Sequence, residues 1–334
     1  MKIKSLKLQT TLRVFVALIF STTIISCNKE KGVLPTISQF VVGLKDLSQL
    51  EASAIKADLV IALSNKNTAS GSDGNFTVFA PTNQAFQKIG LVNPQDLNAL
   101  QTPFLISVLK YHLSNGSTKD EMLPNTSTLN SLLGEDIKKT IVIRDGEKYV
   151  NGSKIIVVDT KTDNGVVHVI NRVLLASGTD IANTAIFFAQ GKGFVKPELS
   201  FLVEAAIYCD LVDELENPNA NYTVFAPTDQ AFKDLGKILG VAIENPADIR
   251  KLDKATVTQV LLNHVVSNGG SKFTSQLYTG NLQTLSGKNI TLGEYINGLL
   301  SVKGAGNNIA ANMVIPDIQT TNGIVHVIDR VLLP

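Results

Sequence analysis

One stretch of sequence decides the fold because it occurs twice: NFTVFAPTNQAF at residues 75–86 and NYTVFAPTDQAF at residues 221–232. Each copy begins with a short β-rich run that a proline stops, since proline cannot donate a backbone hydrogen bond to a sheet. The proline is followed by Thr82 or Thr228, and threonine is a good residue for capping the first turn of a helix. Each copy therefore predicts a strand, a turn and a capped helix.

A second stretch is also repeated: NGVVHVINRVLL at residues 164–175 and NGIVHVIDRVLL at residues 322–333. Its almost continuous Val, Ile and Leu suit a strand that is covered on both faces. We expect the Asn-Gly pair that opens each copy to be a turn that tolerates positive φ. Helical spacing of apolar residues comes early in each repeat and β-branched runs come late, so the sequence predicts an α+β domain, occurring twice.

The repeat is far longer than a solenoid unit, so it indicates a duplicated domain rather than a stacked array. A chain of 334 residues also has the usual length of two domains. We place the first domain at residues 35–176 and the second at residues 179–334. The join between them is so short that it restricts their relative orientations.

The amino terminus has the order of an export signal. Residues 1–13 are basic, residues 14–25 (VFVALIFSTTII) form a short apolar run, and Ser26 and Cys27 follow. The end of this segment resembles the lipobox of bacterial lipoproteins, in which the cysteine is acylated and the chain is cut before it. We expect a signal peptide at 1–26, a lipid anchor on Cys27 and a tether at 27–34. An ordinary secretory signal with a chance cysteine is the alternative.

The position after the cysteine bears on location. Asn28 stands where an aspartate would resemble an inner-membrane retention signal. We therefore expect an outer-membrane lipoprotein that faces the cell surface, with the periplasmic face as the alternative.

Charge and motifs exclude several function classes. Without residues 1–26 the chain has 26 basic and 29 acidic residues, a net charge of −3, which provides no electrostatic footprint for nucleic acid. The sequence contains no nucleophile elbow, zinc-protease helix, P-loop or dinucleotide fingerprint. It also has no Cys/His cluster. We therefore expect no enzyme activity, no metal and no cofactor.

The repeated stretches resemble the two characteristic boxes of fasciclin domains, in the right order and in both copies. Tyr111-His112 resembles the tyrosine–histidine pair of that family, whereas the second copy has Asn263-His264. Pro316-Asp317-Ile318 resembles a Pro-Asp-Ile motif of adhesion members of the family. The resemblance implies two tandem domains, each a β-wedge or sandwich flanked by helices, that act in adhesion.

The resemblance nominates six residues for ligand contact: Tyr111, His112, His264, Pro316, Asp317 and Ile318. A structural role is the alternative, because a histidine at a helix end favours the helix dipole and an aspartate often caps a turn. His168 and His326 lie inside apolar runs, so we expect each to bond a backbone carbonyl in the core.

The expected function is a lipid-anchored adhesion or binding module that contacts an extracellular or surface protein or a polysaccharide. An accessory lipoprotein that binds a glycan or another nutrient is the alternative. Partner capture on matrix proteins would favour the first function, and retention on polysaccharide would favour the second.

Overall fold

The computed structural model describes residues 33–68, 73–191, 193 and 199–334. The expected signal peptide (1–26), the lipidation candidate Cys27 and most of the tether lie outside these residues. Residues Leu34–Pro334 form one compact unit that contains both repeats. Within the described ranges, every helix is too short or too polar to cross a bilayer.

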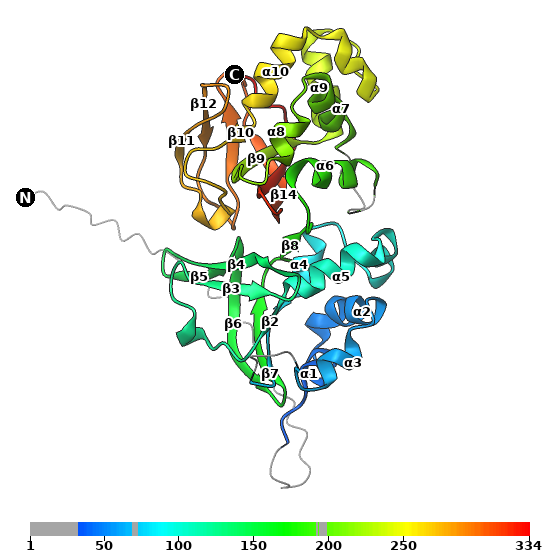
Figure 1. Cartoon of the computed structure of the whole chain (residues 1–334), viewed down its shortest axis with the longest axis vertical. Coiled ribbons are helices and arrows are strands. Elements are labelled where there is room, and N and C mark those ends of the chain that lie inside the picture. The colour runs from blue at the N-terminus through cyan, green and yellow to red at the C-terminus, as the bar shows by residue number, and fades with distance from the viewer. Residues whose placement is uncertain (1–32, 69–72, 192, 194–198) are drawn as a thin grey trace, which may run out of the picture. The chain divides into compact units, whose positions relative to one another are not determined.

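The first repeat begins with helices and ends with strands (Figure 1). Its helices are α1 (Ile37–Val42), α2 (Ser48–Lys56), α3 (Val60–Ser64), α4 (Asn83–Gln87) and α5 (Thr102–Tyr111), with 3₁₀ turns at Lys45–Leu47, Pro94–Ala99 and Asp120–Met122. Its strands are β1 (Phe76–Pro81), β2 (Leu113–Asn115), β3 (Thr128–Ser131), β4 (Gly134–Arg144), β5 (Glu147–Val150), β6 (Ser153–Thr162), β7 (Gly165–Ile170) and β8 (Leu175–Ala176).

The second repeat has the same order of elements, except that the described residues contain no counterpart of the 3₁₀ turn Lys45–Leu47 or of β8. Its helices are α6 (Ile181–Ala189), α7 (Ser200–Tyr208), α8 (Val212–Glu216), α9 (Asp229–Leu239) and α10 (Lys254–Leu262), with 3₁₀ turns at Pro246–Lys251 and Thr274–Gln276. Its strands are β9 (Tyr222–Pro227), β10 (Val265–Val266), β11 (Gly280–Gln283), β12 (Asn289–Leu292), β13 (Ser301–Gly304), β14 (Ala311–Gln319) and β15 (Gly323–Ile328). The α+β expectation is confirmed in both copies.

The two repeated sequence boxes are neighbours in one sheet. Strand order is β2-β1-β7-β6-β5-β4-β3 in the first repeat and β10-β9-β15-β14-β13-β12-β11 in the second, where β8 also pairs with β14. Strand β1 pairs with β7 in parallel, and β9 pairs with β15 in the same way, whereas the other pairs along each main path are antiparallel. All residues of β1, β7, β9 and β15 are buried, as a strand covered on both faces requires.

The expected helix caps are present after β1 and β9. The hydroxyl of Thr82 accepts a hydrogen bond from the backbone N–H of Ala85 at 3.2 Å, and Thr228 caps Ala231 at the same distance. Each threonine satisfies one of the N–H groups that the first turn of a helix leaves without a partner. The helix after each box is thereby fixed directly beside the central strand pair.

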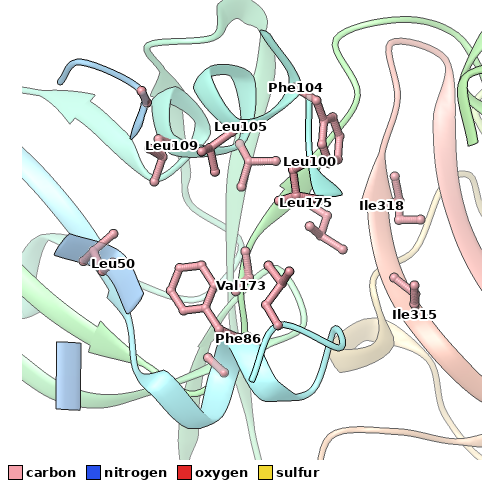
Figure 2. Packing of buried hydrophobic residues seen from close by; sticks show 14 of the residues in the cluster. Leu50, Phe86, Leu100, Phe104, Leu105, Leu109, Val173, Leu175, Ile315 and Ile318 are labelled. Atoms are coloured by element: carbon pink, nitrogen blue, oxygen red, sulfur yellow. The ribbon is translucent and has the colours of Figure 1, made fainter. Parts of the chain in front are cut away.

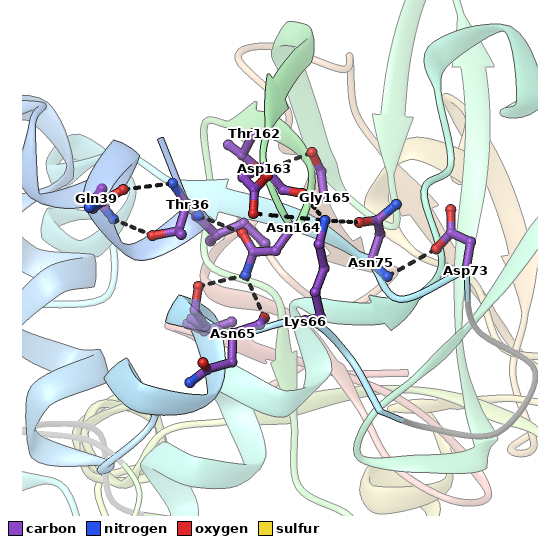
Figure 3. A network of polar contacts seen from close by, with 12 residues as sticks. Thr36, Gln39, Asn65, Lys66, Asp73, Asn75, Thr162, Asp163, Asn164 and Gly165 are labelled. Atoms are coloured by element: carbon purple, nitrogen blue, oxygen red, sulfur yellow. Dashed lines mark hydrogen bonds and ion pairs between the residues drawn. The ribbon is translucent and has the colours of Figure 1, made fainter. Parts of the chain in front are cut away.

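The Asn-Gly pairs differ from the expectation, because neither Asn164, Gly165 nor their second-repeat counterparts adopt positive φ. Instead, the side chain of Asn164 fastens helices to the sheet (Figure 3). Its Oδ1 accepts from Ile37 N at 2.8 Å, and its Nδ2 donates to the carbonyls of Leu63 and Asn65 at 2.9 and 2.7 Å. The start of α1 and the end of α3 are therefore held by one buried amide.

Asn322 makes the same three bonds in the second repeat. It accepts from Ile181 N at 2.9 Å and donates to the carbonyls of Leu215 and Asn217 at 2.8 and 3.0 Å. The glycine that follows is required for close packing: a Cβ at Gly323 would lie 2.5 Å from the carbonyl oxygen of Tyr222. Asn-Gly here joins strands and helices rather than forming a left-handed turn.

One hydrophobic cluster includes residues of both repeats. Figure 2 shows Leu175, at the end of the first repeat, in the same cluster as Ile315 and Ile318 of β14. Strand β8 pairs in parallel with β14, with Leu175 opposite Ile318. Burial of apolar surface contributes roughly 25 cal/mol per Å², so this shared cluster stabilises the repeats against separation.

A buried lysine closes the end of α5. Lys139 is fully buried, and its ammonium donates to the carbonyls of Tyr111, Leu113 and Asn130 at 3.1, 2.9 and 3.4 Å. The last carbonyls of a helix carry partial negative charge and lack intrahelical partners. Burial nevertheless lowers the pKa of Lys139 to about 7.

We predict that Asn164→Ala lowers the free energy of unfolding by about 3 kcal/mol, because it removes three buried hydrogen bonds worth about 1 kcal/mol each. Denaturant unfolding followed by circular dichroism measures the change. Asn219→Ala is the control, since Asn219 is exposed. A loss as small as that of the control would show that the amide does not hold the helices.

We predict that the free energy of unfolding rises as the pH increases from about 7 towards 10. The native pKa of Lys139 lies below the usual lysine value of 10.5, so the unfolded chain binds more protons across this range. The slope due to this residue is at most about 1.4 kcal/mol per pH unit. Lys139→Met should remove that slope, whereas Lys138→Met, at the exposed neighbouring position, should keep it. Equal slopes in the two variants would contradict the assignment.

Candidate functional site

The six residues nominated for ligand contact are buried. Their side chains form part of the interior: Tyr111 and Ile318 at 0% exposure, His112 and His264 at 2%, Asp317 at 9%, and Pro316, which is also buried. None of the six lies on the exposed surface in this conformation, although His112 and His264 line the apolar cavities described below. Direct ligand contact by these residues stays a prediction that requires them to become exposed.

His112 and His264 hold the same position in the two repeats. Nδ1 of His112 donates to the carbonyl of Val108 at 2.7 Å, and Nε2 accepts from Leu174 N at 2.9 Å. His264 does the same with Val260 and Leu332, at 2.7 and 2.8 Å. Burial lowers the pKa of both histidines to about 4. Each neutral ring therefore connects a helix to the last residues of the second box, which follow its strand.

His168 and His326 use the opposite ring nitrogen as donor. Nε2 of His168 donates to the carbonyl of Thr118 at 2.8 Å, and Nε2 of His326 donates to that of Lys272 at 3.0 Å. Their Nδ1 atoms accept from the backbone N–H of Asp159 and Asp317, respectively. Desolvation lowers the pKa of both rings. The expected bond to a core carbonyl is present in each repeat.

These bonds leave no ring nitrogen of the four histidines for other chemistry. A metal ligand or a general base needs a free imidazole lone pair, and here each accepting nitrogen already holds a backbone N–H. Among the described residues, no three His, Cys, Asp or Glu side chains gather in a way that could hold a metal ion.

Asp317 bonds to a 3₁₀ turn that is distant in the sequence rather than capping a turn of its own segment. Its backbone has φ of 65°, and its carboxylate accepts from the N–H and hydroxyl of Thr274 at 2.6 and 2.7 Å. Asp159 has φ of 56° and caps Asp120 N at 2.7 Å in the first repeat. The aspartate thus fastens a 3₁₀ turn to a strand irregularity in both copies, with or without a preceding proline. Aligning the repeats on their second boxes pairs these two residues.

Tyr111 joins the two repeats. Its hydroxyl accepts from Nδ2 of Asn151 at 2.7 Å and donates to the side chain of Gln319 in the second repeat. Asn263, in the same position of the second repeat, instead accepts at 3.1 Å from the hydroxyls of Thr284 and Ser286. Tyr111 therefore makes a hydrogen bond between the repeats, whereas the asparagine at the equivalent position makes hydrogen bonds within its own repeat.

Arg144 makes a second contact between the repeats that the sequence did not reveal. Its guanidinium donates to the carbonyls of Leu277 and Thr274 at 2.6 and 3.3 Å. It also lies 3.7 Å from the ring centroid of Tyr295, a distance that favours cation–π attraction. The preceding run and the Asp145-Gly146 turn predict only a hairpin, so nothing local in the sequence marks this arginine.

Each repeat contains an apolar cavity between its opening helices and its sheet. The cavity measures about 230 Å³ in the first repeat and about 170 Å³ in the second. Equivalent residues line the two cavities: Ala54 and Ala206, Leu59 and Leu211, Leu63 and Leu215, Val78 and Val224, His112 and His264, Leu113 and Val265. Apolar cavities with few polar groups are the usual form of ligand sites, so these two are the strongest candidate sites.

The comparisons with known proteins agree with the duplicated architecture. A model of the fasciclin domain matches residues 45–176 and 197–334. Human (Homo sapiens) periostin is 30% identical over 275 residues, covering 78% of this chain and 28% of periostin. The transforming growth factor-beta-induced protein ig-h3 of Sus scrofa is 25% identical over 264 residues, covering 78% of this chain and 35% of that protein. The chain thus spans about a third of the length of these two relatives.

The chain is also similar to a bacterial protein and to a solved structure. Protein sll1483 of Synechocystis sp. is 34% identical over 146 residues, covering 42% of this chain and 73% of that protein. A solved FAS1 domain pair from the insect cell adhesion molecule fasciclin I is 19% identical, with a TM-score of 0.39, and covers 78% of this chain and 89% of that one. Because the family model matches most of the sequence in two copies, the chain belongs to the fasciclin domain family.

Proposed function

We propose that this chain is a lipid-anchored adhesion or binding module of the cell envelope whose two domains contact extracellular or surface proteins. The observation that carries the proposal is the apolar cavity that recurs at equivalent residues of both domains. The insect relative of known structure is named a cell adhesion molecule, which agrees with this class of function. The engaged histidines support a binding role rather than a catalytic one.

The lining of the cavities favours a protein partner over a glycan. Sugars are recognised through hydrogen bonds, whereas most of the side chains around these cavities are aliphatic. A cavity of 230 or 170 Å³ accommodates one or two apolar side chains. Such side chains commonly anchor protein interfaces in pockets. A lipoprotein that binds a glycan or another nutrient remains the second candidate, because such a protein would carry the same kind of export signal that we expect at the amino terminus of this chain.

Filling both cavities should abolish partner binding while the fold is kept. In the double variant Ala54→Leu and Ala206→Leu, added methyl groups occupy the space that a partner side chain needs. Stability should be unchanged or rise by about 1 kcal/mol. Beads coated with the chain are tested for retention on surfaces coated with extracellular protein or with polysaccharide. We expect at least about tenfold weaker retention on protein.

Ala62→Leu is the control, because Ala62 is exposed on α3 and does not line the cavity. It should bind protein like the unmodified chain. Undiminished retention of the double variant on protein would contradict the cavity as the binding site. Retention on polysaccharide alone, insensitive to both changes, would favour the second candidate.

The lipid anchor is tested by removing its thiol. Cys27→Ser should release the protein from the membrane fraction, since an acyl chain contributes roughly 0.8 kcal/mol of membrane affinity per buried CH₂. Cys209→Ser is the matched control, because Cys209 is a buried core residue. Fractionation and blotting give the result, and protease treatment of intact cells separates the outer surface from the periplasm. Unchanged membrane retention of Cys27→Ser would disprove the anchor.

A further inference from the structure

The first domain has a socket that the second domain fills. The first-repeat socket consists of Ala85, Ile89, Asn151, Gly152 and Arg172, and Pro316 and Asp317 of β14 line it from the other repeat. Only about 20 Å³ remains empty. A Cβ at Gly152 would lie 1.8 Å from the carboxylate of Asp317, which shows how closely the domains approach. Arg172 closes the contact by donating to the carbonyl of Asn297 at 2.9 Å.

The second domain has the same socket, and there it is open. The second-repeat socket is lined by Ala231, Leu235 and Arg330, which correspond to Ala85, Ile89 and Arg172 of the first, together with a longer loop that includes Ile309. Its volume is about 210 Å³. Ile238 and Ile309 are 73% and 62% exposed beside it. Nε of Arg330 is buried and makes no hydrogen bond within the described part of the chain, and the same holds for Nε of Arg172 in the filled socket.

The first domain, in turn, has the surface that would fill such a socket. Val158 and Asp159 correspond to Pro316 and Asp317, and Asp159 has the same left-handed backbone and the same bond to a 3₁₀ turn. Pro316 is buried, but Val158 is 43% exposed. We define the Val158 face by the exposed apolar residues of β6 at this position: Ile156 and Val158.

The chain therefore carries a second socket, on the second domain, and a second surface of the kind that fills it, on the first domain. Within one chain these two surfaces do not contact each other. We propose that the chain associates head to tail with a second copy of itself: the second-repeat socket of one copy receives the Val158 face of the next. This assembly goes beyond the proposed adhesion function and does not depend on it.

Charged side chains of both signs lie near the two surfaces, so net charge does not select this contact. Asp234, Asp329 and Arg330 surround the second-repeat socket. Lys148 lies beside the Val158 face, where it pairs with Asp120 at 2.7 Å, and Asp120 is held by Asp159. In this contact, Lys148 and the acidic groups of the face lie opposite the carboxylates and Arg330 of the socket. Because the two surfaces differ, the contact is heterologous, and a heterologous contact that does not close forms open chains rather than a symmetric dimer.

The test is sedimentation velocity of Leu34–Pro334, the compact unit that contains both domains. We expect the average mass to increase with concentration beyond that of a dimer. Ile309→Asp damages the socket and Val158→Asp damages the face; both residues are exposed, so both variants should fold. Each change should weaken association at least about tenfold. Ile61→Asp is the control, because Ile61 is 72% exposed on α3, outside both surfaces.

Mixing the variants distinguishes head-to-tail contact from other modes. The Ile309→Asp chain keeps an intact face and the Val158→Asp chain keeps an intact socket, so an equimolar mixture should form dimers and nothing larger. Circular dichroism first establishes that each variant is folded. A single-chain mass at every concentration would overturn the proposal. The proposal would also be overturned by a symmetric dimer that forms equally well in both variants. Association that is weakened by Ile61→Asp but by neither of the other changes would contradict it as well.

Discussion

The rest of each domain depends on the parallel pairing of its first long strand with its last. In the first repeat β1 lies beside β7 with Phe76 opposite Gly165, and a Cβ at that glycine would lie 2.2 Å from the Phe76 carbonyl oxygen. Parallel neighbours need a long connection, and here the segment between β1 and β7 supplies α4, α5 and the other five strands of the same sheet before the chain returns as β7. Asn164 lies at the end of this pair and holds α1 and α3. Residues of α1 and α3 line the cavity of the first repeat together with Val78 of β1, so the Asn164 bonds hold the helices that form part of its wall.

The same constraint explains the two kinds of histidine. His168 lies within the paired strand, where its neighbours are apolar, and it stacks on Phe79 at a centroid distance of 5.3 Å. His112 follows α5 and accepts a hydrogen bond from the backbone N–H of Leu174, which lies after β7 at the end of the second box. One ring connects the sheet to the loop before the 3₁₀ turn, and the other connects a helix to the segment after the sheet. Both have lowered pKa values because burial disfavours the charged imidazolium.

Local pattern predicted much of this architecture. The duplication, the caps at Thr82 and Thr228 and the core position of His168 follow from spacing and side-chain chemistry alone. The roles of Asn164 and Arg144 do not, because the partners of each lie far away in sequence and only the folded chain brings them together. Tyr111 illustrates the same limit: family resemblance suggests a contact residue, but whether its hydroxyl faces solvent or another domain depends on the domain beside it.

Two differences between the repeats lie at the contact between them. Tyr111, which bonds Gln319 across the joint, is replaced by Asn263, which bonds inside its own domain. The tight hairpin at Asn151 and Gly152 is replaced by the longer loop before β14. By contrast, the positions that hold helices to the sheet keep both residue and geometry, as Asn322 shows. The bonds that hold the helices to the sheet are therefore the same in both domains, whereas Tyr111 and the Asn151-Gly152 hairpin, which contact the other domain, differ from their counterparts.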